Sequence, residues 1–307
     1  MNKEFRMNSP ALITWQQKAI SAGHLAAACG TALGAVAFVA GSPYVVTAAA
    51  ALVGLDWYTR SKRDNDAFKR LEGIVQSGAL DVASQQRLTG IVDEYSQRAL
   101  LKQPVRIVSM SASDKEMLPE FRESLLETYP SRLIVIDKDF ANTLSDPQLR
   151  AGLAHEIVHV ADDAATTKVI ADKITKFGIY VAVGGVITTA LSLNIPATAI
   201  ATLFFGAITL SNVAIQASLA RHGEYVADRG SVLLARDPGA AISGLSELKK
   251  FAESKKPTKT DLDTPLSSNP RFSFFNKLGV ALLRPHLTDA ARSRFMFKVA
   301  KQYNIDS

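Results

Sequence analysis

Cysteine and aromatic residues are scarce in this sequence. Cys29 is the only cysteine among 307 residues, so no disulfide can form within the chain, which is consistent with the reducing cytoplasm. Aromatic residues make up 7% of the chain, and they do not alternate with basic residues as in proteins that bind RNA or DNA. The formal net charge of +6 therefore indicates contact with anionic lipid, and no nucleic-acid partner is predicted.

Charged residues are absent from two long stretches, residues 19–55 and 177–220. A helix needs about 20 apolar residues to cross a bilayer, so each stretch is long enough for two crossings. Turn-forming residues divide each stretch near its middle, Gly-Ser-Pro at 41–43 and Asn-Ile-Pro at 194–196. We therefore predict two transmembrane helical hairpins. A soluble core of buried helices is the alternative, mainly for the first stretch, which is rich in Ala and Gly.

Lysine and arginine flank both charge-free stretches and are absent from their central turns. The flanking residues are Lys3, Arg6 and Lys18, then Arg60, Lys62, Arg63, Lys69 and Arg70, then Lys168, Lys173 and Lys176, and finally Arg221 and Arg229. Because basic residues stay on the inner side of a membrane, both termini and the polar segments are predicted to lie in the cytoplasm. This pattern predicts a multi-pass membrane protein.

Residues 155–159 read H-E-I-V-H, a pattern that indicates a metal-dependent hydrolase. Two histidines four residues apart project from nearly the same face of a helix, so His155 and His159 can bind one Zn²⁺. Glu156 points about 100° away, where it can take the proton of a water that attacks a carbonyl group. The alternative is a pair of helix-surface histidines beside an ion-paired glutamate.

A second polar pair follows the second charge-free stretch. Glu224 and Asp228 are four residues apart and share a helical face. A catalytic zinc site with two histidines needs a third protein ligand, which Glu224 can supply. Asp228 can then accept a hydrogen bond from the other ring nitrogen of a ligating histidine. A solvated acidic face without function is the alternative.

With these residues in place, the chain resembles the HtpX-type membrane metallopeptidases, which are gluzincins related to the CAAX prenyl proteases. In that family a HExxH helix is followed by hydrophobic spans and by a motif close to S-R-H-x-E-[FY]-x-A-D. Residues 220–228 match this motif with Ala220 in place of the usual Ser. The resemblance implies a multi-pass protein of the bacterial inner membrane with its active site in the cytoplasm.

The resemblance also implies a role for each residue of the two motifs. It implies that one zinc ion per chain is held by His155, His159 and Glu224, that Glu156 is the general base, and that Asp228 orients a ligand. Two other family features differ here. The N-A-[FY]-A segment has no clear counterpart near Pro119–Glu123, and the T-H-P motif appears as Ser268-Asn269-Pro270. These differences concern how a substrate is positioned.

His222 lies two residues before Glu224 and points away from the metal-binding face of a regular helix. It could stabilise the oxyanion of a tetrahedral intermediate if it faces the cleft, or it could be an interfacial histidine without a catalytic role. A second open question concerns residues 133–136, an apolar run that is rich in β-branched residues. This run could be an edge strand that pairs with a substrate peptide, or a paired strand in the core.

The fold class that these patterns predict is mainly α with a small β-sheet, a zincin-type α+β catalytic domain combined with two transmembrane hairpins. Predicted elements are a helix over 64–103, strands at 105–110 and 133–136, a helix that begins at 145–147, helices over 240–250 and 287–303, and a loop over 253–270. The predicted divisions are an N-terminal hairpin (1–63), the first catalytic part (64–176), the second hairpin (177–220) and the second catalytic part (221–307).

Together the motifs predict a zinc endopeptidase that cleaves membrane or misfolded proteins at the cytoplasmic membrane surface. Its expected partners are protein or peptide substrates and the lipid bilayer. A non-catalytic membrane adaptor or chaperone is the main alternative, although Glu156 would then have no chemical purpose beside the metal. A prenyl-protein processing protease is a further alternative, and four predicted spans argue against it.

Overall fold

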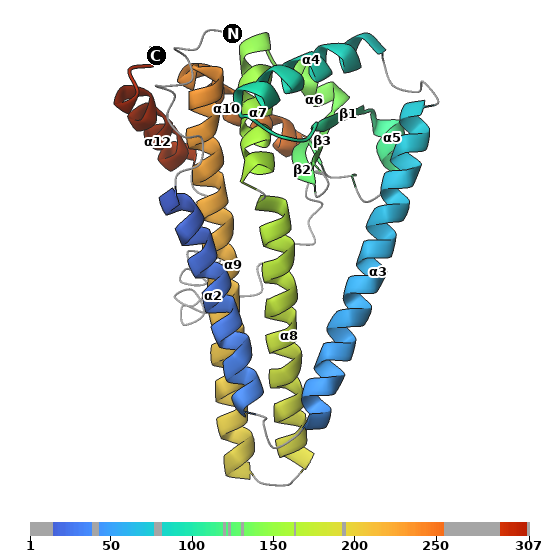
Figure 1. Ribbon diagram of the computed structural model, residues 1–307, viewed down its shortest axis with the longest axis vertical. Helices are drawn as coiled ribbons and strands as arrows, with labels where there is room; N and C mark the ends of the chain where they lie inside the picture. Colours follow the sequence, from blue (N-terminus) through green and yellow to red (C-terminus); the bar gives the residue numbers. More distant parts are fainter. Residues whose placement is uncertain are drawn as a thin grey trace.

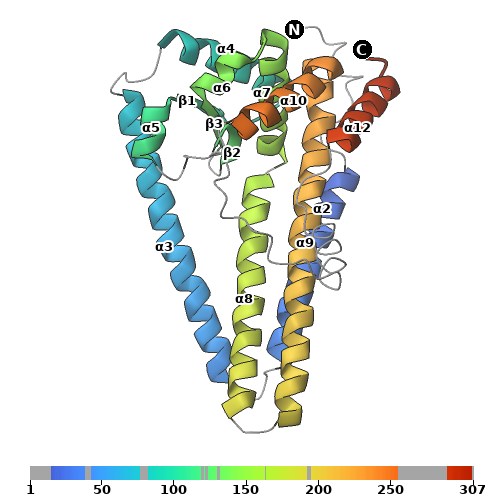
Figure 2. The ribbon, with the colours of Figure 1, turned by 180° about the vertical axis from the view of Figure 1, so that it is seen from behind.

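The computed structural model describes residues 15–38, 43–76, 82–118, 121, 124–129, 132–162, 164–191, 195–254 and 289–305. These residues are mostly helical, with one small mixed sheet, as predicted. They form two regions, which Figures 1 and 2 show at opposite ends of the molecule. The stem consists of four long helices, and the head holds the sheet and the shorter helices. Gly41, Ser42 and Asn194 of the predicted turns lie outside the described residues, whereas Pro43, Ile195 and Pro196 already belong to helices. Most of the 253–270 loop, with Ser268-Asn269-Pro270, and all of Pro119–Glu123 except Phe121 also lie outside the described residues.

The stem is built from two consecutive pairs of helices. They are α2 (Trp15–Phe38) with α3 (Pro43–Gln76), and α8 (Ala164–Leu191) with α9 (Ile195–Ala235). α2 packs against both α8 and α9, whereas α3 packs against α8 and diverges from it toward the head (Figure 1). The buried stem core is made of small and branched residues, Ala35, Ala49, Val181, Ala182 and Ile208. Small side chains let helix backbones approach closely.

The four predicted membrane spans are not confirmed by length and hydropathy. Among the described residues, one stretch is long and apolar enough to cross a bilayer, the 22 residues of Ile170–Leu191. Thr47–Asp56 is apolar but shorter. The first stretch gives a weaker signal because alanine and glycine carry little apolar surface, so a long charge-free run there has only moderate hydropathy.

The sheet has three strands, β1 (Arg106–Met110), β2 (Leu126–Tyr129) and β3 (Leu133–Asp137), in the order β1-β3-β2. β1 runs parallel to β3, and β2 runs antiparallel to it, with Thr128 opposite Ile134. Every residue of β3 is buried. The run predicted at 133–136 is therefore a paired core strand between two edge strands, β1 and β2. β2, which the sequence pattern does not predict, is the edge strand that lines the cavity.

The head contains six helices among the described residues. They are α4 (Val82–Arg98), α5 (Ala112–Met117), α6 (Lys138–Thr143), α7 (Asp146–Ala161), α10 (Pro238–Ser254) and α12 (Asp289–Gln302). The single helix predicted over 64–103 is wrong, because α3 continues to Gln76 and a separate helix begins at Val82. α3 and α9 also run through the divisions predicted at 63/64 and 220/221. Those divisions follow changes in composition, which need not interrupt a helix.

α7 and α9 cross closely where both carry polar site residues. A Cβ atom on Gly230 would lie 2.3 Å from Cγ2 of Val158, so only glycine fits at this contact. Val158, Val226 and Ala227 are fully or almost fully buried around it. The close crossing brings the α7 histidines within reach of side chains on α9.

Candidate metal centre

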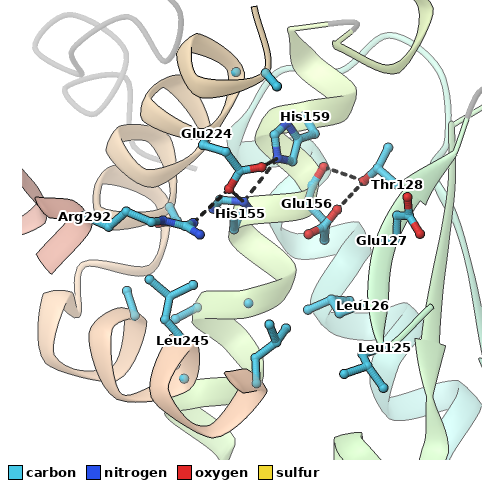
Figure 3. A pocket seen from close by; sticks show the side chains of 18 of the residues that line it. Leu125, Leu126, Glu127, Thr128, His155, Glu156, His159, Glu224, Leu245 and Arg292 are labelled. Carbon is cyan, nitrogen blue, oxygen red and sulfur yellow. Dashed lines mark hydrogen bonds and ion pairs between the residues drawn. The ribbon is translucent and has the colours of Figure 1, made fainter. Parts of the chain in front are cut away.

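The local sequence explains why residues 146–161 form a helix with the histidines on one face. Ser145 and Gln148 form a capping box at the N-terminus, and Pro147 occupies the first turn, where a missing N–H is tolerated. Ile157 and Val158 are completely buried on the core side. His155 and His159 are therefore turned toward the cavity between α7, α9 and β2 (Figure 3).

The structure brings three predicted ligands together. Nε2 of His155 lies 3.1 Å from Nε2 of His159 and 3.6 Å from Oε2 of Glu224, and Nε2 of His159 lies 3.7 Å from Oε1 of Glu224. Ligand atoms about 2.0–2.1 Å from a tetrahedral ion are separated from one another by about 3.3 Å. The spacing and the donor set of two imidazoles and one carboxylate therefore fit Zn²⁺.

Asp228 fixes the orientation of His155. Its Oδ1 atom lies 3.2 Å from Nδ1 of His155, and its side chain is completely buried. A carboxylate at this position favours the tautomer in which Nδ1 carries the proton and donates it to Asp228. Nε2 then presents its lone pair to the space between His159 and Glu224.

Arg292 is part of the same cluster, although it is not among the residues predicted from the sequence. Its guanidinium donates from Nε to Oδ2 of Asp228 at 2.8 Å and from Nη2 to Oδ1 at 2.5 Å, and Nη2 lies 3.1 Å from Oε2 of Glu224. The sequence feature that could have identified Arg292 is its place on α12, where it shares one helical face with the buried residues Met296 and Val299. An arginine on an apolar stripe is expected to be buried and paired.

α12 is held against α9 by two contacts near the cluster. The rings of Tyr225 and Phe295 pack edge to face with centroids 4.9 Å apart. Arg229 donates a 2.9 Å hydrogen bond to the hydroxyl of Tyr303. These contacts fix the position from which Arg292 reaches the metal-binding residues.

Glu156 is buried beside the cluster and is held by Thr128 of the edge strand. The Thr128 hydroxyl lies 2.7 Å from Oε2 of Glu156 and 3.1 Å from its backbone carbonyl oxygen. Burial raises the pKa of Glu156 to about 7, against the lowering effects of His155 and of the hydrogen bond from Thr128. A carboxyl group with a pKa near neutrality is suited to accept and release a proton.

The ionisable side chains of the cluster leave an excess of negative charge that a divalent cation would balance. Glu156, Glu224 and Asp228 carry three negative charges when ionised, and Arg292 carries one positive charge. Burial opposes ionisation of Glu224, yet His155, His159 and Arg292 hold its pKa below the usual range. Burial and the neighbouring His155 lower the pKa of His159 to about 4, so its imidazole is neutral and able to bind a metal near pH 7.

His222 does not line the cavity that contains the cluster. Its Nε2 atom lies 3.0 Å from the backbone carbonyl oxygen of Gln17, and its ring stacks on that of His24 at a centroid distance of 6.1 Å. Nε2 of His24 lies 2.8 Å from the hydroxyl of Ser218. The two histidines thus connect α2 to α9, and the structure favours the interfacial role for His222.

The cluster opens into a cavity of about 870 Å³. One side is formed by β2 and the preceding Leu125, and the opposite side by α9 and α10 (Figure 3). Leu126 packs on Gly152 of α7, where its Cδ2 atom lies 3.0 Å from the position of an added Cβ. This volume is large enough for several residues of an extended peptide.

Two histidines and a carboxylate form a metal-binding set, with a further glutamate beside them and an edge strand along the cavity. This is the arrangement of a metal-dependent peptidase. The sequence model of peptidase family M48 matches residues 126–294, more than half of the chain, so the chain belongs to this family of zinc-dependent metallopeptidases. The predicted resemblance to HtpX-type and CAAX proteases is thereby confirmed. Searches of curated proteins and of solved structures found no match.

Proposed function

We propose that the chain is a zinc endopeptidase that hydrolyses peptide bonds of membrane or misfolded proteins at the cytoplasmic surface of the bacterial inner membrane. The observation that carries the proposal is the set of ligand atoms on His155, His159 and Glu224 at tetrahedral spacing, with Glu156 buried beside it. Membership of peptidase family M48 supports the same chemistry.

The residues of the cluster have different roles in hydrolysis. His155, His159 and Glu224 would hold one zinc ion, which when bound polarises a carbonyl group and lowers the pKa of a water molecule. Glu156 accepts the proton of the attacking water and passes it to the leaving amine. Thr128 holds Oε2 of Glu156, so we assign the proton transfer to Oε1.

Exposed side chains of the stem support its insertion in a membrane. Among the residues that the structure describes, eleven of the fourteen exposed large hydrophobic residues lie on the stem helices, and three lie on the head. The stem residues are Ile20, Leu52, Leu55, Tyr58, Ile170, Val183, Ile187, Leu191, Ile200, Leu203 and Leu210. Water-exposed apolar surface on this scale is rare on soluble proteins, and hydrocarbon is the solvent in which it is stable.

The stem also supports the proposed topology. Both hairpins reach away from the head; α2 begins at the side of the stem that faces the head, and α12 lies in the head (Figures 1 and 2). Basic residues flank the hairpins on the head side, so the head and both termini belong in the cytoplasm. On this basis 1–63 is a transmembrane hairpin with cytoplasmic flanks, 177–220 is the second transmembrane hairpin, and 64–176 with 221–307 form the catalytic domain.

The test compares purified wild-type protein with Glu156→Gln, which keeps the size of the side chain and removes its basicity. The variant should retain one zinc per chain and lose hydrolysis of casein by about 10²–10⁴-fold. Glu116→Gln, at an exposed position of the head, serves as the matched control and should keep full activity. Zinc binding without hydrolysis in the wild type would favour the adaptor or chaperone alternative, and near-wild-type activity of Glu156→Gln would remove Glu156 from the role of base.

A further inference from the structure

The residues that line the cavity lie on both sides of the metal-binding cluster along α7, from Gln148 near its start to Asp162 just beyond its end. One arm, the distal arm, runs toward the N-terminus of α7 and is lined by Leu144, Gln148, Leu245 and Leu248. The other, the stem arm, runs toward the start of α8 and is lined by Ser21, Thr167, Gln216 and Ala220. The metal-binding cluster lies between the two arms.

The two arms differ in their distance from the proposed membrane. α7 ends at Ala161 and α8 begins at Ala164, and the apolar stretch of α8 starts at Ile170 (Figure 1). Gln216 and Ala220 belong to the charge-free part of α9. The stem arm therefore opens at the membrane end of the site, and the distal arm lies away from it.

The direction of β2 along the cavity is fixed by two contacts. Leu126 packs on Gly152, and Thr128 contacts Glu156, which lies one turn further along α7. β2 therefore runs from the distal arm toward the stem arm. Gln148 and His159 are separated by about 16 Å along the helix axis, a length that about five extended residues cover.

A substrate that adds to the edge of β2 would favour the antiparallel direction, because parallel pairing is slightly less stable per residue. Its N-terminal side then occupies the stem arm, and its C-terminal side occupies the distal arm. The apolar side chains of Leu245 and Leu248 would face residues that follow the cleaved bond.

From this placement we propose that the substrates are membrane-anchored chains whose cleaved segment follows a membrane span. The residues before the cleaved bond then lead back to the bilayer through the stem arm, and the residues after it leave through the distal arm. A cytoplasmic segment that precedes a span would have to enter with the opposite polarity. This inference rests on the proposed peptidase function and deepens it by naming the substrate class.

The test uses two single-span reporters in vesicles with the wild-type enzyme. Both carry the same casein segment, which the enzyme cleaves in solution, within about three residues of the span on the cytoplasmic side. In one reporter the segment follows the span, and in the other it precedes the span. The first should be cleaved at least tenfold faster, and a linker of about 30 residues should remove the difference.

The outcomes separate this inference from the proposed function. If free casein is not cleaved, the peptidase function itself fails. If casein is cleaved while the two short-linker reporters are cut at equal rates, the proposed direction of the substrate in the cavity is wrong and the peptidase function survives. If casein is cleaved and neither reporter is cut, the proposed class of membrane-anchored substrates is wrong and the peptidase function again survives. Faster cleavage of the reporter whose segment precedes the span would also overturn the inference.

A binding experiment tests the polarity without catalysis. In the Glu156→Gln protein, a photo-crosslinking amino acid in place of Ser21 should attach to the half of the casein segment before the cleavage site. The same amino acid in place of Leu248 should attach to the half after it. The reverse assignment would overturn the inference.

A pair of substitutions on α2 tests the stem arm directly. Ser21→Trp should narrow this arm and slow cleavage of the short-linker reporter at least fivefold. Ala19→Trp, at an exposed position outside the cavity lining, should not change it. Equal rates for both variants would exclude the stem arm as the path of the chain.

Discussion

Head and stem are stabilised by different means. The head core packs large side chains such as Phe121, Phe140 and Met110, and it encloses charged pairs such as Lys115 with Asp137. The stem packs alanine and valine inside and presents large apolar residues outside. Enclosed polar pairs fix exact positions, which a catalytic site needs, whereas small-residue packing fixes only how closely helices approach.

Charged residues in the stem occur near its junction with the head. Asp56 of α3 pairs with Lys173 of α8 at 2.8 Å and with Lys176 at 3.3 Å, and Lys176 also lies 3.0 Å from Asp172. These side chains are half-buried or nearly buried. These ion pairs neutralise Asp56, the carboxylate at the end of the first charge-free stretch, and hold α3 to α8 where the helices begin to diverge.

The largest expected effect is that of a lysine substitution on the exposed surface of the stem, compared with one on the exposed surface of the head. This comparison tests whether the stem surface faces lipid and the head surface faces water. Leu203 of the stem and Leu100 of the head are 76% and 70% exposed. Leu203→Lys should disfavour membrane insertion by about 3 kcal/mol. Leu100→Lys should change stability by less than about 0.5 kcal/mol. The measurement is the fraction of each variant that resists alkaline extraction from membranes. Equal fractions would remove the contrast between head and stem.

Zinc affinity tests the enclosed polar cluster of the head. Glu224→Ala removes a ligand and should weaken zinc binding by more than about 100-fold, a larger loss than for Asp228→Ala or Arg292→Met. The latter two remove only side chains that orient ligands and balance charge, and about 10–100-fold is expected. Competition with a chelator measures the series. A larger loss for Asp228→Ala than for Glu224→Ala would mean that the third ligand is misassigned.

The crossing of α7 and α9 tests how tightly the head is packed. Gly230→Ala places a methyl group against Val158 and should destabilise the protein by about 2 kcal/mol. Gly90→Ala on α4, where nothing lies within 4 Å of the added group, is the matched control and should be neutral or stabilising. Chemical unfolding of the purified variants measures both. Equal stabilities would show that the crossing can relax.

The smallest effect concerns the alignment of Glu156. Thr128→Val keeps the shape of the side chain and removes its hydroxyl, so kcat should fall about tenfold while KM and zinc content stay unchanged. Thr128→Ser should restore most of the loss because it restores the donor. A change in KM alone would place Thr128 in substrate binding.

The sequence predicted the parts of the site that depend on spacing within one helix. His155 with His159 and Glu224 with Asp228 are each four residues apart, and local periodicity is enough to pair them. Thr128 and Arg292 were missed because they reach the site from β2 and α12, and only the tertiary fold brings these elements to α7. β2 is also too short, with only four residues, to show a clear alternation.

The fold could be predicted to a similar extent and for related reasons. The capped start of α7 and the β-branched run of β3 are strong local signals, and both elements form where expected. The end of α3 was misplaced because the charged residues after residue 59 change its surface without breaking the helix. The pairing that makes β3 central and β2 the edge depends on contacts between strands, which periodicity does not reveal.

X-ray absorption at the zinc edge of the purified full-length protein tests the central claim most directly. The account predicts one zinc per chain, surrounded by nitrogen and oxygen ligands at about 2.0–2.1 Å, with the outer-shell scattering of two imidazoles. Absence of zinc, a third imidazole, or a sulfur ligand at about 2.3 Å, for which Cys29 is the only cysteine source, would contradict it.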